Sequence, residues 1–463
     1  MGERGARVAV VGGGVTGLTT AHRLRALRPP LDVIVLESGD HPGGQLASQL
    51  VGDIRVASGA EALFARRPWG VELCRELGIE LVKPAATGTW LWTDRGLVAY
   101  ASGTAFGIPG DVGDVLRWPG VSRAGRRRAL ADLVKRKRRD ERDETLGSLL
   151  RRRLGDEVTE RALAPLLSDP FAGDVDRLSL RATFPELAAW EAAQGSLLRG
   201  AAASARDVRR AGAAPIRLRP RGGVERIAAR LASGLGERVR TGVRAGGVLR
   251  KGDAWVVSTD VGPVPADAVV LAIDADGVRR ALGPTAGNAT ADLAQIPNVS
   301  TGVVILVYPN GTAERIPDGR GFVVPRGKAP MTACSWLSSA WPDPSFGSRA
   351  VIRCAVGGDG QEEILEADDD EIVAACVRHL AAVLPLPDPP QHASVARWPN
   401  AMPQYLVGHM ERVGRIRDAL PPGIFVAGRA FDGVDVSSCV RSAGAAADEA
   451  ANFVRAITRE TAR

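Results

Sequence analysis

The stretch RVAVVGGGVTG, residues Arg7–Gly17, decides the fold of this chain. Its apolar residues predict a strand, which runs directly into three glycines, and a helical pattern over 18–27 follows. The glycines satisfy the G-x-G-x-x-G pattern of a dinucleotide-binding turn, where a pyrophosphate meets the N-terminus of a helix. Gly12 permits the tight turn, Gly14 lets the phosphates approach the backbone, and Gly17 lets helix and strand pack closely.

A second predicted strand, Asp32–Leu36, completes a βαβ unit. It ends at Glu37, 20 residues after Gly17, where a carboxylate can accept hydrogen bonds from ribose hydroxyls. A second glycine turn, Pro42–Gln45, follows a few residues later. An NAD-binding unit does not usually need such a turn, whereas many flavoproteins place one against the pyrophosphate and flavin end of FAD. We therefore expect FAD rather than NAD.

The composition is that of a globular protein. The chain has 463 residues, 45% of them hydrophobic and 24% charged, which is enough for two or three domains. No apolar run approaches the roughly 20 residues of a membrane-spanning helix, and the first residues lack a signal-peptide pattern, so we expect a cytosolic protein. Five scattered cysteines predict reduced, buried thiols, and five histidines without ligand spacing predict no metal site.

Basic residues are concentrated in one stretch. Between Arg123 and Arg153 stand 13 basic and five acidic residues, an excess larger than the net charge of +7 of the whole chain. No aromatic residues alternate with them and no recognition motif accompanies them, which argues against nucleic-acid binding. Two interpretations stay open: a solvated helix face, or a surface for an acidic partner or an anionic membrane.

The remaining pattern predicts an α/β protein with interleaved domains. Apolar residues recur at helical spacing over 130–153 and 156–167, and a last helix is expected over 437–457. Strand-like segments separated by turn residues are expected at 239–243, 254–259, 268–273, 301–308, 350–356 and 424–427.

Further motifs extend over nearly the whole chain. They are Phe171–Asp174, Arg177–Leu180, Phe184–Leu187, Gly321–Pro325, Thr332–Trp336, Met402–Tyr405 and Gly433–Val436. On these motifs the sequence from Arg7 to about Val454 resembles the protoporphyrinogen/coproporphyrinogen oxidases, FAD enzymes of haem synthesis within the amine-oxidase-like superfamily. The segment 321–342 resembles the branch found in Gram-positive-type bacteria.

The resemblance implies a Rossmann-like FAD-binding domain interleaved with a mixed-sheet substrate domain and a helical subdomain. The expected boundaries are 1–85 with 215–290 and 395–463 for the FAD-binding domain, 291–394 with flanking parts of 86–214 for the substrate domain, and 110–200 for the helical subdomain. We expect one FAD per chain, held without a covalent bond, because no cysteine or histidine is well placed for a flavin linkage.

The resemblance also implies the site residues. Trp398 and the turn Val434–Val436 would line the flavin, and Val243, on a strand, would hold the adenine. The cofactor-binding residues are expected to be Gly12, Gly13, Gly14, Val15, Thr16, Gly17, Glu37, Ser38, Gly44, Gln45, Gly59, Ala60, Glu61, Ala62, Val243, Trp398, Gly428, Val434, Asp435 and Val436.

Single residues outside this set admit two roles. Arg66 and Arg67 would either bind substrate propionates or form an ordinary exposed helix start. For His409 we expect a structural role rather than that of a general base, because the sequence places no acid or metal ligand near it. Cys439 favours packing against the last helix. Arg429 departs from the small residue that the family often has, which we expect to tune substrate fit.

The implied activity is oxygen-dependent, six-electron oxidation of a porphyrinogen by hydride transfer to FAD, with hydrogen peroxide released. No catalytic residue is predicted. Coproporphyrinogen III is favoured over protoporphyrinogen IX by the bacterial branch and by the arginine excess. An FAD amine oxidase or carotenoid desaturase is the alternative, disfavoured by Leu178-Ser179 and Pro403–Tyr405, and a silent flavin-binding scaffold stays open. The expected partners are the next haem-pathway enzyme or an anionic membrane surface, with peripheral membrane contact as one possibility for a cytoplasmic protein.

Overall fold

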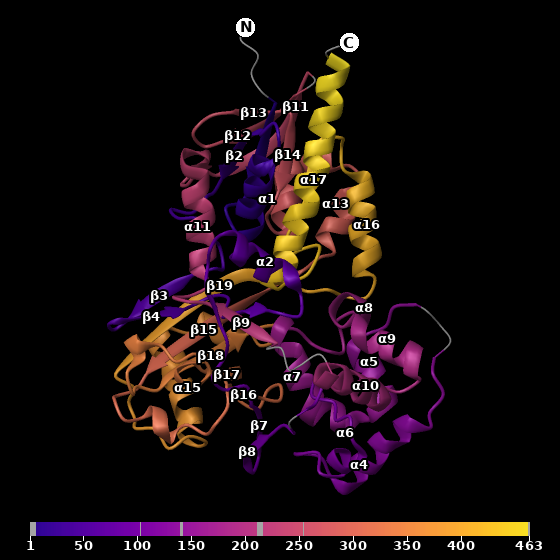
Figure 1. Ribbon diagram of the computed structural model, residues 1–463, viewed down its shortest axis with the longest axis vertical. Coiled ribbons are helices and arrows are strands. Elements are labelled where there is room, and N and C mark those ends of the chain that lie inside the picture. The colour runs from indigo at the N-terminus through magenta and orange to yellow at the C-terminus, as the bar shows by residue number, and fades with distance from the viewer. Residues whose placement is uncertain (1–5, 102, 139–141, 211–215, 253, 462–463) are drawn as a thin grey trace.

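The computed structural model describes residues 6–101, 103–138, 142–210, 216–252 and 254–461. Figure 1 shows three packed parts: a sheet with helices at the top, a second sheet at the lower left, and a group of helices at the lower right. The upper part is built from segments near both ends of the chain and from its middle. This arrangement confirms the predicted α/β class with interleaved units.

The upper sheet is parallel throughout. Val8 and Val10 of its central strand face one core, and Ala9 and Val11 face another, so both sides of the sheet are covered. Double burial explains why this strand reads as a continuous apolar run. The order of the strands is β10 (Val239–Arg240), β2 (Asp32–Leu36), β1 (Arg7–Val11), β14 (Ala268–Leu271) and β20 (Ile424–Val426).

Helices and a small sheet cover the two faces of this parallel sheet (Figure 1). One face carries α1 (Val15–Ala26), α2 (Pro68–Glu76), α11 (Glu225–Leu235) and α17 (Val436–Thr461). The other carries the antiparallel strands β11 (Ala245–Lys251), β12 (Ala254–Thr259) and β13 (Val264–Ala266), with α12 (Ala275–Leu282), α13 (Ala289–Ala294) and α16 (His409–Ala419).

The second sheet is mixed: β16 pairs with β7 in parallel, and the other strand pairs of this sheet are antiparallel. One of its faces packs on α15 (Asp369–Ala381). The long edge strand β19 crosses the expected domain boundary at residue 395. The strand order is β19 (His392–Pro403), β15 (Asn298–Val307), β18 (Val351–Gly357), β17 (Met331–Trp336), β16 (Gly321–Val323), β7 (Thr89–Thr93) and β8 (Gly96–Ala99).

Short strands connect the two large sheets. The hairpin β3 (Ser48–Val51) and β4 (Ile54–Ala57) packs with the apolar end of the mixed sheet. A second small sheet has β9 (Arg217–Pro220) between β5 (Leu63–Phe64) and β6 (Leu81–Val82).

The helical subdomain is more broken than the sequence pattern predicts. The described residues form α3 (Val112–Leu116), α4 (Arg123–Leu130), α5 (Leu146–Leu154), α6 (Asp156–Val158), a π-helical turn (Thr159–Leu163), α7 (Ala164–Ser168), α8 (Leu180–Thr183), α9 (Pro185–Gln194) and α10 (Leu197–Arg210). The helical spacing over 130–153 does not correspond to one continuous helix: α4 ends at Leu130, a 3-10 turn covers Ala131–Leu133, and Thr145 caps the start of α5.

Several basic residues of the stretch 123–153 form hydrogen bonds and ion pairs within the helical subdomain. Arg128 donates to the carbonyl oxygens that end α5, at 3.1 Å from each of Arg151, Arg152 and Arg153. The Arg153 side chain is fully buried and pairs with the buried Asp132. Part of the predicted basic surface is thus internal, while residues 139–141 lie outside the described chain.

Candidate functional site

The first glycine turn has the geometry that the sequence predicts. Gly12 has a φ of +104°, and a Cβ there would lie 2.6 Å from the carbonyl oxygen of Ala272. A Cβ at Gly17 would lie 1.9 Å from the carbonyl oxygen of Gly12, so α1 packs too closely on the turn for any side chain. These two glycines are therefore required by the backbone itself.

Gly14 differs from its neighbours, because a Cβ built there would meet nothing within 4 Å. It precedes Val15, the first residue of α1, and supplies no side-chain cap, so the first N–H groups of α1 open onto this space. The second glycine turn packs beside it: the Gly43 N–H donates to the Gly13 carbonyl at 2.9 Å. The N-terminus of α1 and the two glycine turns, beside the open space at Gly14, are groups that fit the pyrophosphate of FAD.

Glu37 lies next to the first glycine turn. Its carboxylate accepts hydrogen bonds from the N–H groups of Gly13 and Gly39, both at 2.7 Å, and Ser38 beside it is exposed. Val243 is buried and donates its N–H to the Glu37 carbonyl at 2.8 Å. The expected strand over 239–243 ends early, at Arg240, so Val243 lies in the loop that follows rather than on a strand.

Four segments that are distant in the sequence meet around Gln45, Ala60, Trp398 and Arg429. Ala60 donates its N–H to the Gln45 carbonyl at 2.9 Å, and the Trp398 indole donates to the Ser58 carbonyl at 2.8 Å. Arg429 donates to the side-chain oxygen of Gln45 and to the carbonyl of Ala401. Burial holds the pKa of Arg429 below its ordinary value. The turn 59–62 and Trp398, both expected among the cofactor-binding residues, are thus brought together, and Arg429 adds a positive charge beside them.

The loop before α17 packs against the start of α1, where a Cβ on Gly428 would lie 3.1 Å from the Thr16 hydroxyl oxygen. Gly428 has a φ of +107° and donates its N–H to the Ser442 hydroxyl at 2.8 Å. Asp435, with Val434 before it and Val436 after it, accepts from the Ser438 N–H at 3.1 Å and so caps α17.

Arg67 binds this loop rather than standing free. Its guanidinium lies 2.5 Å from the Asp435 carboxylate and donates to the Ser438 hydroxyl at 2.6 Å. Arg66 is exposed. The contacts of Arg67 therefore favour a structural role for it, and neither residue lines the two cavities described below.

The family motifs are mainly docking contacts between the three parts. The Ser179 N–H donates to the Tyr405 carbonyl at 2.7 Å, and the Gln404 amide donates to the Phe171 carbonyl at 2.9 Å. The Tyr405 hydroxyl donates to the Arg429 carbonyl and accepts from the Gly433 N–H. These residues join the helical subdomain to the loop before α17.

His409 has the structural role that its sequence context favours. It is 2% exposed and stacks on Tyr405 with 3.8 Å between ring centroids. Burial lowers the pKa of His409 to about 4, so the ring is neutral at pH 7. Cys439 is buried, as are the other four cysteines.

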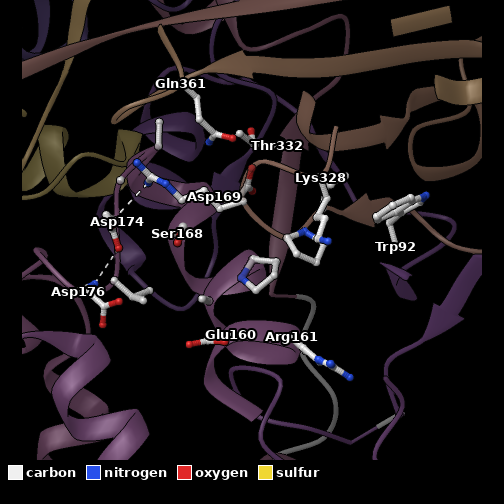
Figure 2. A pocket seen from close by; sticks show the side chains of 18 of the residues that line it. Trp92, Glu160, Arg161, Ser168, Asp169, Asp174, Asp176, Lys328, Thr332 and Gln361 are labelled. Carbon is white, nitrogen blue, oxygen red and sulfur yellow. Dashed lines mark hydrogen bonds and ion pairs between the residues drawn. The ribbon is translucent and has the colours of Figure 1, made fainter. Parts of the chain in front are cut away.

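A cavity of about 490 Å³ lies between the helical subdomain and the mixed sheet. Figure 2 shows Asp174 and Asp176 on one side of it, Lys328 and Trp92 on the other, and Asp169 between them. Glu160 and Arg161 belong to the π-helical turn, a feature that is frequent at functional sites. A volume in this range suits a large organic ligand.

A second cavity of about 100 Å³ adjoins the first, because Asp169 lines both. It is lined by Glu61 of the Gly59 turn and by three arginines, Arg217, Arg320 and Arg353. These arginines lie in no motif that the sequence indicates as a binding site. One signal was present: Arg353 interrupts the apolar strand VIRCAVG, in which a charged residue is costly unless it has a purpose.

The chain is similar to known flavin-dependent oxidoreductases. The model of the flavin containing amine oxidoreductases matches residues 15–451. Proteins named coproporphyrinogen III oxidase are 32% identical in Mycobacterium tuberculosis H37Rv, over 98% of both chains, and 28% identical in Bacillus subtilis 168, over 96% of this chain and 98% of that one.

Solved structures share the fold. A crystal structure from Exiguobacterium sp. 255-15, provisionally assigned as a protoporphyrinogen oxidase, has a TM-score of 0.87 and 28% identity, covering 98% of this chain and 100% of that one. A putrescine oxidase, at 16% identity and a TM-score of 0.73, shares the fold over 96% of this chain and 99% of its own. With these motifs and these relatives, the chain belongs to the flavin containing amine oxidoreductase family, as an oxidoreductase related over its full length to porphyrinogen oxidases.

Proposed function

We propose that this protein oxidises coproporphyrinogen III to coproporphyrin III, with dioxygen as the final acceptor and hydrogen peroxide as the second product. Removal of six electrons and six protons from the ring reduces three dioxygen molecules to three of hydrogen peroxide. The observation that carries this proposal is the pair of adjacent cavities, the smaller of which is lined by Glu61 of the Gly59 turn and by three arginines. The names of the full-length relatives support the same substrate.

FAD, when bound, supplies the hydride acceptor. We propose that Gly12–Gly17, Glu37 and Gly44 hold its pyrophosphate and ribose, and that Ala60, Trp398 and Val434–Val436 hold its flavin end. The chain then has to orient a large ring, exclude water and neutralise carboxylates, which needs no nucleophile and base pair. His409 is neutral and stacks on Tyr405, so we assign it no part in proton transfer.

Gly14 provides a sharp test of the cofactor proposal. Gly14→Val should fold, because its side chain enters open space, but should lose FAD, because the same space is needed by the pyrophosphate. Gly17→Val is the matched control and should fail to fold, since its Cβ would meet the Gly12 carbonyl at 1.9 Å. Wild-type protein should be yellow and release its flavin on acid precipitation. Flavin left on the precipitated chain would contradict non-covalent binding.

The substrate is tested by following porphyrin fluorescence from coproporphyrinogen III and protoporphyrinogen IX side by side. A higher kcat/KM for the first is expected. A chloroplastic relative from Oryza sativa, 27% identical over 97% of this chain and 90% of its own, is named protoporphyrinogen oxidase and makes the second ring the relevant competitor. No turnover of either ring by FAD-loaded protein would favour the silent scaffold.

A further inference from the structure

The smaller cavity is lined by more basic side chains than acidic ones. Arg217, Arg320 and Arg353 line it together with the carboxyls of Glu61 and Asp169. Three guanidinium groups against two carboxylates leave one positive charge in a cavity of about 100 Å³. An uncompensated charge in such a place is costly unless something else balances it.

The register of the mixed sheet explains why a cavity exists here. Arg353 of β18 lies opposite Ser335 of β17, and Ser335 lies opposite Gly321 of β16. In the next row Ala355 lies opposite Ala333. These small residues share the face of the sheet that looks away from α15, so this face is hollow where it meets the arginines.

The donors of these arginines are only partly used within the described chain. Arg353 donates from Nη2 to the Gly59 carbonyl at 2.6 Å, while its Nη1 lies 4.0 Å from Glu61 and its buried Nε has no partner. Arg320 donates from Nε to the Thr89 hydroxyl at 2.9 Å. The Arg217 side chain forms no hydrogen bond or ion pair with other described residues.

The charges influence one another across the cavity. Burial, and next the charge of Arg217, lower the pKa of Arg320 to about 10, so it is still positive at pH 7. Burial raises the pKa of Glu61, but the charges of Arg353 and Arg217 outweigh this effect and hold it below its ordinary value. Glu61 is therefore ionised and is one of the two carboxylates in the charge balance above. The remaining positive charge of the cavity has to be balanced by a group that does not belong to its lining.

We propose that Arg217, Arg320 and Arg353 form a binding subsite for a carboxylate of the substrate. The inference rests on the proposed function, because it assigns the anion to a propionate of the porphyrinogen. Arg353 also joins the Gly59 turn to the subsite, so a bound carboxylate would fix the ring relative to the flavin side of the cavity. The paired N–H groups of a guanidinium match a carboxylate well.

The test measures binding of coproporphyrin III and of its tetramethyl ester to FAD-loaded protein by fluorescence, in one detergent-containing buffer. Arg320→Gln and Arg217→Gln should each weaken binding of the free acid by about tenfold or more, and binding of the ester by less than about twofold. Arg349→Gln is a control outside the cavity. The Arg349 side chain is 13% exposed, and its donors are used by Asp53, Phe346 and Ser345.

The outcomes separate this inference from the proposed function. Equal loss of acid and ester, or no loss of either, would overturn the subsite even if wild-type protein oxidises coproporphyrinogen III. Selective loss of the acid in a protein that oxidises no porphyrinogen would keep the subsite and overturn the proposed function. If Arg320→Gln does not retain FAD and fold, Arg217→Gln decides, with Arg320→Lys as the charge-retaining variant that should recover part of the affinity.

Discussion

Arginines in two regions of the molecule show opposite use of the same side chain. In the helical subdomain, Arg153 is fully buried and every nitrogen of its guanidinium donates, to Asp132 and to the carbonyls of Asp132, Lys135, Arg136 and Gly195. In the mixed sheet, Arg353 keeps a buried Nε without a partner among the described residues. The first group is balanced by the fold itself, whereas the second is not.

The difference lies in what surrounds each group. Asp132 also accepts from the Ser196 hydroxyl at 2.6 Å and the Leu198 N–H at 2.9 Å, so Arg153 and Asp132 connect the turn after α4 with α5 and α10. Arg353 instead faces small side chains and a cavity. A satisfied arginine therefore indicates a structural role, and an unsatisfied one beside a cavity indicates a ligand.

The largest effect should come from breaking the satisfied group. Arg153→Met leaves the Asp132 carboxylate buried without its charge partner, which should destabilise the helical subdomain by about 3–5 kcal/mol. Hydrogen exchange of the α5 and α10 amides measures this local free energy. Arg151→Gln is the control: its ion pairs are exposed, and the expected loss is below about 1 kcal/mol. Equal protection in the two variants would contradict the assignment.

A pH series should show a smaller effect at Glu191, which binds Arg152 at 2.5 Å. Burial raises its pKa, but the hydrogen bond and charge of Arg152 outweigh this, so the pKa lies below its ordinary value of 4.5. Its contribution to stability is then present above the unfolded-state pKa and is lost as the pH falls through the folded-state value. Glu191→Gln should cost about 1–2 kcal/mol at pH 7, and the difference from wild type should vanish in acid. A cost independent of pH would argue against the charge interaction.

The sequence was sufficient for the parts of the fold that local patterns control. The βαβ unit follows from apolar runs and glycines within a few residues of one another, and β1, β2 and β12 have the predicted bounds. The hairpin β7–β8 and the strand β19 were not predicted. Their partners in the mixed sheet, β16 for β7 and β15 for β19, lie far away in the sequence, so no local pattern shows this pairing.

The site divides in the same way. Glu37 could be placed because its distance from Gly17 along the chain is fixed by one βαβ unit. Arg320 and Arg217 could not be placed, because 55 arginines give each one a low specificity and the cavity forms from segments about 100 residues apart. The role expected for Arg67 overlooked Asp435, which only the tertiary fold brings within reach.

Arg67 allows a weaker test of the same distinction. Arg67→Ala removes an ion pair whose side chains are 32% and 27% exposed, so we expect a cost of about 1 kcal/mol at the loop before α17. The kcat/KM values for coproporphyrinogen III and protoporphyrinogen IX should fall by about fivefold together, because the loop and not a propionate loses its partner. Arg66→Ala should leave both values unchanged. A selective loss for coproporphyrinogen III would instead make Arg67 a substrate ligand.

The smallest effect on stability is expected at the exposed end of the basic stretch. Arg123, Arg127 and Arg136 are exposed, and their side chains form no hydrogen bond or ion pair with other described residues, unlike Arg138, which pairs with Glu144 at 3.3 Å. Changing the three to glutamine should alter the free energy of unfolding by less than about 0.5 kcal/mol and leave turnover intact, because no packing or pairing is lost. If the stretch meets an anionic membrane, the same variant should bind anionic vesicles about fivefold more weakly for each charge removed, and only at low salt. Unchanged vesicle binding would assign these three arginines to a solvated face, and a large loss of stability would show that they belong with Arg153 after all.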